Sequence, residues 1–123
     1  AQSRMALRMM ITEPAQVDRA MAWVAASDPA TAGLAIAELS TTDIREATKA
    51  INAPTLLIGA SGAAPEAMRP GMAKAYEAQV TGMKTVRVIM ADKARHFIML
   101  DDPALLFSAL DDFLAARRQT RER

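Results

Sequence analysis

His96 is the only histidine of the chain, and its neighbours decide what it can do. A histidine changes charge near neutral pH, so it can take a proton from a nucleophile and return one to a leaving group. A lone histidine beside apolar residues such as Phe97 and Ile98 is more often a hydrogen-bonded structural group. Here Asp101 follows His96 by five positions and Pro103 follows it by seven. This spacing makes His96 our candidate for a general base and acid.

Ser61 lies in the run Gly-Ala-Ser-Gly-Ala at residues 59–63, which comes close to the G-x-S-x-G pattern of a nucleophile elbow. Such an elbow needs small residues because its turn is strained and packs tightly against its neighbours. Pro65, however, interrupts the helix that should begin at once. Ser61 is therefore a candidate nucleophile, and the alternative is a small-residue loop beside the site.

Composition excludes several classes of chemistry. The chain has 123 residues, the size of one small domain, and 51% of them are apolar, which is enough for a packed core. Because it has no cysteine, it has no disulfide, thiol nucleophile or zinc–thiolate site. Neither a metal-ligand spacing nor a phosphate-binding glycine loop is present. We therefore expect no metal.

The charge pattern argues against nucleic-acid and membrane partners. The net charge is +1, so no basic footprint is visible. No apolar run approaches the roughly 20 residues that span a bilayer. A basic run is interpreted as a solvated helix end, where cations complement the helix dipole; it consists of Arg117, Arg118, Arg121 and Arg123. We expect a soluble protein, and its compartment stays open between the cytoplasm, the periplasm and the exterior.

The elements that would position His96 begin in the middle of the chain. Residues 55–59 form an apolar run without alternation, the pattern of a strand covered on both faces, as in a parallel sheet. A loop rich in glycine, alanine and proline follows over 60–70. Residues 71–81 then predict an amphipathic helix closed by Gly82, and residues 85–91 predict a second strand.

A last helix is predicted to begin at Asp102 and Pro103, because aspartate caps a first turn and proline fits the first helical position. Its buried stripe would consist of Leu106, Leu110, Phe113 and Leu114. The order strand, helix, strand, loop, helix indicates a parallel sheet with a right-handed crossover.

Residues 1–51 are predicted to form a string of short helices rich in alanine and methionine. Residues 4–11 indicate the end of one helix, and Thr12 is the expected cap of a second helix over 13–26. Methionines at helical spacing are more often core, and otherwise a flexible wall for an apolar substrate; those in question are Met5, Met9, Met10 and Met21. The same two interpretations apply to Trp23.

Two further helices complete this half. Asp28 followed by Pro29 is typical of a helix start, because the carboxylate caps the first turn. The buried side of this helix would hold Leu34, Ala35 and Leu39. Asp43 is expected to begin a short helix, with Glu46 three residues on as its capping-box partner.

Two strands are too few for a stable parallel sheet, because both faces and both edges must be covered. The residues left at the edges are strongly apolar: Leu56, Leu57, Ile58, Val86, Val88 and Ile89. We expect further strands from the N-terminal portion of the same protein, as a second chain, or from a copy of this one. The first residue is Ala1, which is consistent with a processed chain or a piece of a longer one. The alternative is a mostly helical domain with one small hairpin-like sheet.

The segment from Ala94 to Pro103, Ala-Arg-His-Phe-Ile-Met-Leu-Asp-Asp-Pro, resembles the C-terminal signature of the α/β-hydrolase superfamily. In that family a histidine in the loop after the last strand precedes an acidic residue and a proline at this spacing. Residues 43–45 and 51–59 resemble the family's return from the helical cap into the seventh strand. The resemblance covers nearly the whole chain. It implies an α/β fold whose mostly parallel sheet is completed by another segment or chain.

Within that fold, the resemblance implies that residues 1–51 are cap helices with the return to the core, and that residues 52–123 are the C-terminal part of the core. It also implies a triad in which a serine attacks, His96 acts as base and acid, and an acid fixes the imidazole tautomer. The family places its nucleophile well before these strands. The serine is therefore expected outside this chain, with Ser61 as the minor candidate.

The triad acid is the main departure from the family. It usually follows the glycine that ends the seventh strand by three positions, and here that position is Gly62, which has no side chain. The acid is then supplied by the end of an earlier strand outside this chain, or it is Glu66, or it is absent.

The resemblance implies a hydrolase of carboxylic esters or similar small apolar acyl compounds that uses no cofactor. Fold membership does not fix the reaction: lactonase, dehalogenase, C–C hydrolase and cofactor-free haloperoxidase chemistries also occur in this family. The missing acid at position 62 favours a second hypothesis, a non-catalytic ligand-binding or interaction protein on the same fold. The expected partners are a small apolar substrate and either the N-terminal portion of the protein or further copies of this chain.

Overall fold

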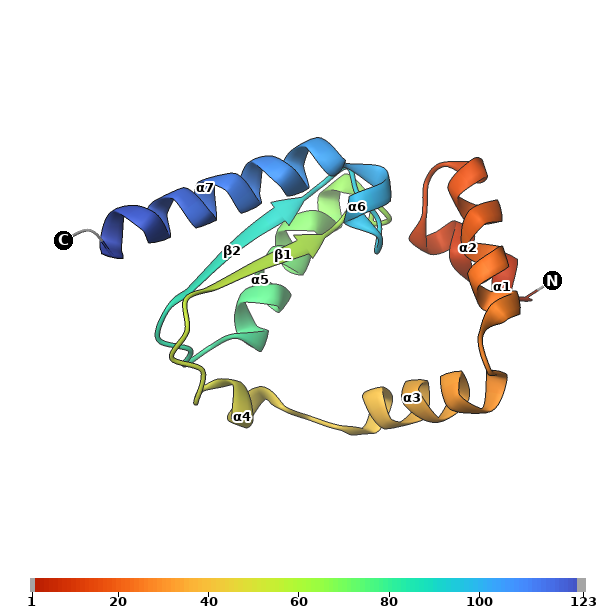
Figure 1. Cartoon of the computed structure of the whole chain (residues 1–123), viewed down its shortest axis with the longest axis horizontal. Helices are drawn as coiled ribbons and strands as arrows, with labels where there is room; N and C mark the ends of the chain where they lie inside the picture. The colour runs from red at the N-terminus through yellow and green to blue at the C-terminus, as the bar shows by residue number, and fades with distance from the viewer. Residues whose placement is uncertain (1, 122–123) are drawn as a thin grey trace.

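A computed structural model describes residues 2–121 of the chain, with the side chains of residues 117–121 excepted. The basic run predicted for the C-terminal end therefore lies outside the described side chains. The elements follow in the order α1 (Gln2–Met10), α2 (Pro14–Ala26), α3 (Pro29–Thr41), α4 (Arg45–Thr48), β1 (Thr55–Ala60), η1 (Glu66–Met68), α5 (Arg69–Gln79), β2 (Val86–Ala91), α6 (Ile98–Asp101) and α7 (Pro103–Arg121). The chain belongs to the mixed α/β class (Figure 1).

The two strands pair in parallel, in a register that runs from Thr55 opposite Val86 to Ala60 opposite Ala91. A parallel pair needs a crossover, and α5, which contacts β2, supplies it. The prediction of a β-α-β unit is thus confirmed, and the alternative of a hairpin-like sheet is wrong. The expected loop over 60–70 is shorter than predicted, because η1 and the first turn of α5 lie within it.

The main core cluster lies in the N-terminal helix pair rather than under the sheet. Its buried members are Leu7, Ile11, Val17 and Ala20, and Met21, Phe97 and Leu100 pack against them. Phe97 and Leu100 come from the segment that follows β2. This cluster therefore joins α1 and α2 to Phe97 and α6, the segment that directly follows His96.

Helix α3 has no buried residue, so the predicted buried side of this helix is wrong for the described chain. Leu34 is 73% exposed and Leu39 is 80% exposed, because no described element packs against them. The stripe predicted on α7 is also incomplete: Leu106 and Phe113 are partly covered, whereas Leu114 is 51% exposed.

Two of the predicted helix caps are confirmed. Asp28 accepts a hydrogen bond from the Thr31 amide at 2.7 Å, and the Thr31 side chain together with this amide lowers the pKa of the Asp28 carboxyl. Asp102 likewise accepts from the Leu105 amide at 3.1 Å at the start of α7. Both carboxylates satisfy amides that the first helical turn leaves without partners.

The predicted cap at Thr12 and the predicted capping box of Asp43 with Glu46 are wrong, because these side chains bind tertiary or ionic partners instead. Thr12 does not cap α2 but bonds to Asp101, 89 residues further on. Asp43 does lie just before the short helix α4 and accepts a hydrogen bond from the Arg45 amide at 3.0 Å. The Arg45 guanidinium binds the same carboxylate and holds the pKa of Asp43 well below its usual range. Glu46 forms no capping box and pairs with the Lys49 ammonium at 2.6 Å.

The chain exposes far more surface than a compact monomer. Its accessible surface is 9166 Å², whereas a monomeric protein of 13.2 kDa exposes about 6,400 Å². The exposed large apolar side chains lie mostly on α1, α2, α3 and α7, and the large apolar residues of both strands are only half-buried. A sheet with two free edges and half-buried apolar strands is therefore the defining feature of this fold.

Gly59 marks the closest approach between β1 and the elements beside it. A Cβ at this position would lie 2.6 Å from a Tyr76 ring carbon and 2.8 Å from the Met90 sulfur. We predict that Gly59→Ala lowers the free energy of unfolding by about 1–3 kcal/mol through overpacking. The measurement is urea denaturation.

Gly33→Ala is the matched control. No atom lies within 4 Å of the Cβ that it adds in the middle of α3. Alanine favours a helix over glycine by about 1 kcal/mol, so this variant should be as stable as the wild type or more stable. Equal stability of the two variants would contradict the close approach at Gly59.

Candidate functional site

The parallel pairing brings the carboxyl ends of both strands to one rim, where the loops after β1 and β2 meet. The Ser61 amide donates to the Ala91 oxygen at 3.2 Å, and the Gly62 amide donates to the Ala94 oxygen at 2.8 Å. Ala91 and Ala94 have no exposed surface. The small residues between β1 and η1 thus allow two backbones to touch beneath the loop that carries His96.

Gly62 is the position at which the sequence resemblance predicts an acid. A Cβ built there would lie 2.6 Å from the Ala94 oxygen and 2.7 Å from the Lys93 oxygen. Both neighbours are backbone atoms and cannot rotate away. A side chain at position 62 therefore requires the loop after β2 to move.

Ser61, the minor nucleophile candidate, is enclosed at this contact. It is 1% exposed, and its hydroxyl donates to the Asp92 carboxylate at 2.5 Å. A charge-assisted bond of this kind is stronger than a bond between neutral groups. The hydroxyl therefore links the loop after β1 to Asp92, the residue that directly follows β2.

His96 lies at the same rim with an exposed side chain. It lines a concavity of about 330 Å³, whose other walls are Met9, Ile58, Ala60, Ala63, Tyr76, Arg95 and Ile98. The Phe97 ring meets the imidazole edge-on, with 5.1 Å between the centroids. Among the described residues no hydrogen bond or ion pair engages the imidazole. Both ring nitrogens are available to groups outside these residues.

Glu66, the candidate acid, lies beside a different concavity of about 320 Å³, which it lines with Arg69, Met90 and Asp92. Within the described residues no hydrogen bond connects Glu66 to His96 or to Ser61. The structure brings Ser61 together with Asp92, and it brings neither candidate to the imidazole.

Sequence reasoning missed Asp92 altogether and missed the contacts that Asp101 makes at this rim. Asp92 directly follows β2 and holds Ser61. Asp101 accepts hydrogen bonds from the Arg95 amide and from Thr12. A charged residue directly after a buried strand was the available signal for Asp92, whereas no local pattern could pair Thr12 with Asp101.

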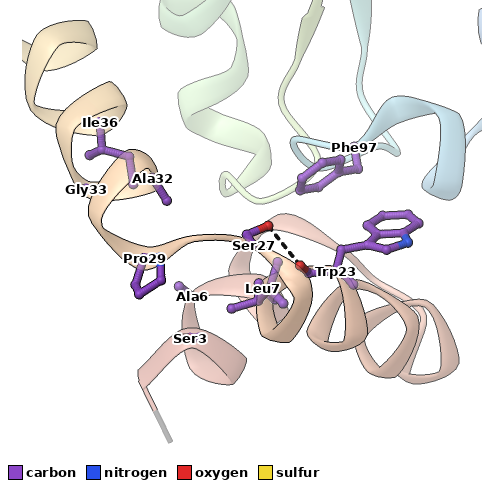
Figure 2. A pocket seen from close by; sticks show the side chains of 12 residues that line it. Ser3, Ala6, Leu7, Trp23, Ser27, Pro29, Ala32, Gly33, Ile36 and Phe97 are labelled. Atoms are coloured by element: carbon purple, nitrogen blue, oxygen red, sulfur yellow. Dashed lines mark hydrogen bonds between the residues drawn. The ribbon is translucent and has the colours of Figure 1, made fainter.

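A larger apolar groove lies on the helical side of Phe97. It has a volume of about 530 Å³ and is formed by α1, α2 and the first half of α3. Figure 2 shows Phe97 and Trp23 on one side of it and Ile36 on the other. Trp23 is therefore a half-exposed wall residue rather than core, with the Arg19 guanidinium 5.4 Å from its ring centroid.

The methionines divide between the two interpretations. Met21 packs against the core cluster, whereas Met9 lines the concavity that contains His96. Met5 is 74% exposed.

Among the described residues no cluster of histidine, aspartate and glutamate could hold a metal ion. Over the same residues no helix combines the length and the apolarity needed to cross a bilayer.

Comparison with known proteins was made at the level of families, of curated sequences and of solved structures. The chain matches no family model, no curated protein and no solved structure.

The bond between Ser61 and Asp92 should contribute measurably to stability. We predict that Ser61→Ala lowers the free energy of unfolding by about 1–2 kcal/mol, since it removes a charge-assisted hydrogen bond at a partly buried contact. Urea denaturation is the measurement. Ser40→Ala is the control, because Ser40 is exposed on α3 and its hydroxyl donates only to the Ile36 oxygen of the same helix. This variant should change the free energy of unfolding by under about 0.5 kcal/mol. Equal losses of unfolding free energy in the two variants would contradict a structural role for Ser61.

Proposed function

We propose that the chain is the C-terminal part of a serine-type α/β-hydrolase that cleaves a carboxylic ester or similar small apolar acyl compound. His96 is its general base and acid. The observation that carries this proposal is the imidazole at the carboxyl-end rim of a parallel strand pair, exposed to a concavity and free of partners among the described residues. Such rims are where open α/β sheets place their ligands.

The proposed chemistry assigns the imidazole two proton transfers. It takes the proton of an attacking hydroxyl as that oxygen bonds to the acyl carbon, and it then gives a proton to the departing alcohol. A water molecule repeats the sequence on the acyl-enzyme and releases the acid. Ser61 is a poor source of the hydroxyl, because it is buried and already bonded to Asp92.

The nucleophile and the orienting acid are therefore assigned to polypeptide outside these residues. Either the N-terminal portion of the same protein or a second copy would add strands to the free edges of the sheet. The excess of exposed surface over a compact monomer supports this part of the proposal. The apolar walls around the imidazole, among them Met9, Ile58 and Ile98, suit an uncharged acyl group.

A non-catalytic ligand-binding or interaction protein on the same fold is the second candidate. The observation that favours it is the close approach at Gly62, which leaves no room for an acid at the family's position. In that case the apolar groove beside Trp23 would hold the ligand, and His96 would have no chemical role.

Hydrolysis separates the two candidates. In the complete protein that contains this chain, we predict turnover of a p-nitrophenyl acyl ester, and a loss of at least about 100-fold in kcat in His96→Ala. Lys93→Ala, an exposed neighbour in the same loop, should keep wild-type turnover. Circular dichroism checks that each variant is folded. Ligand binding without turnover, unaffected by His96→Ala, would favour the binding protein.

The assembly makes a separate prediction. Expressed alone, the chain should self-associate or bind a hydrophobic dye strongly, because α3 and the strand edges present apolar surface to water. Light scattering after gel filtration measures the self-association, and the fluorescence of the dye measures its binding. A monodisperse monomer that binds no dye would contradict the proposed completion of the sheet.

A further inference from the structure

The loop that carries His96 is attached to the end of α1 on both sides of the histidine. The Phe97 amide donates to the Met10 oxygen at 3.3 Å. The Arg95 guanidinium donates to two backbone oxygens at the same helix end, those of Arg8 and Ile11. A cation there satisfies carbonyls that the helix leaves unpaired and complements the helix dipole. Both immediate neighbours of His96 therefore depend on the position of α1.

Asp101 also connects the loop that carries His96 to the end of α1. Its carboxylate accepts a hydrogen bond from the Arg95 amide at 2.8 Å. It also accepts from the Thr12 amide at 2.9 Å and from the Thr12 hydroxyl at 3.1 Å. Both carboxylate oxygens are thus used, and each bond has an ionised acceptor. The carboxylate fixes the turn after α1 and the backbone next to His96 in one arrangement.

The side chains on either side of this backbone point to different surroundings. Phe97 packs against the core cluster of α1 and α2, whereas His96 lines the concavity with Ile58 and Tyr76. A rotation of the backbone at Arg95 would change both directions together. Docking of the helix pair and the orientation of the imidazole are therefore mechanically coupled.

We infer that Asp101 is a positioning residue for His96, acting through the Arg95 backbone and the turn at Thr12. The inference rests on the proposed function for the catalytic role of His96. It gives a task to the acidic residue that follows the histidine by five positions, which the proposed chemistry does not use. Asp101 touches no reacting atom in this scheme.

The test compares Asp101→Asn with Asp102→Asn in the complete protein. An amide at position 101 keeps one acceptor oxygen and cannot reproduce all three bonds. The adjacent Asp102 caps α7 through the Leu105 amide, and asparagine caps a helix as well as aspartate does. Asp101→Glu, which keeps both carboxylate oxygens, is the rescue variant.

Three measurements are made on each variant. Hydrogen exchange follows the Arg95 amide, and NMR follows the carbon-bound protons of the imidazole, assigned by their loss in His96→Ala. Steady-state kinetics follows kcat and KM. In Asp101→Asn we expect exchange about tenfold faster, displaced imidazole signals, and kcat about tenfold lower at unchanged KM. Asp102→Asn should match the wild type, and Asp101→Glu should recover part of each effect.

Unchanged imidazole signals and unchanged exchange in Asp101→Asn would overturn the inference. Should the wild type not hydrolyse esters, the proposed function fails, and exchange and NMR still decide whether Asp101 positions the ring. Should Asp101→Asn not fold, Thr12→Val replaces it, because it removes only the hydroxyl donor. That variant should displace the same signals by a smaller amount, and wild-type signals in it would overturn the inference equally.

Discussion

Parallel pairing of β1 with β2 is the constraint on which the rest of the structure depends. Parallel strands need a crossover, so the chain between them must form a helix that returns to the starting edge. The same pairing brings two loops to one rim, where the small residues Ser61 and Gly62 let those loops touch. His96 lies at this rim because the loop after β2, which carries it, packs on the loop after β1.

The loop after β2 is supported by two different kinds of interaction. Below it, backbone hydrogen bonds and the Ser61–Asp92 contact connect it to β1. Beside it, Asp101 and Arg95 connect it to the end of α1, and Phe97 inserts into the core of the helix pair. The two halves of the chain thus meet at the segment that contains the one histidine.

Apolar runs, helical spacing and the Asp-Pro helix start were enough to predict both strands, the crossover helix and the start of the last helix to within about two residues. The caps at Asp28 and Asp102 were predictable because a carboxylate beside proline or at a helix start acts locally. Thr12 was mispredicted because its partner is 89 residues away. A local pattern gives no information about such a contact, and the same holds for the bond between Ser61 and Asp92.

Burial was predicted less well than secondary structure, and Leu34 illustrates the physical reason. An apolar stripe indicates which face of a helix is able to be covered, but the covering element has to be present. In the described chain none packs on α3, so Leu34 and Leu39 face solvent. For the site, sequence reasoning identified His96 and its loop, whereas the concavity around it is formed by residues from four separate segments.

The isolation of α3 has a consequence for how this segment behaves. A helix of 13 residues with no buried residue gains little from tertiary packing, and isolated helices of about this length are only marginally stable in water. Its Asp28 cap and Pro29 start fix where winding begins, and Gly33 weakens its middle. The segment is therefore a helix whose stability depends on another element packing against its leucines. Because α3 also forms one wall of the groove beside Trp23, melting of that helix would open the groove, and a covered α3 would give it a fixed width.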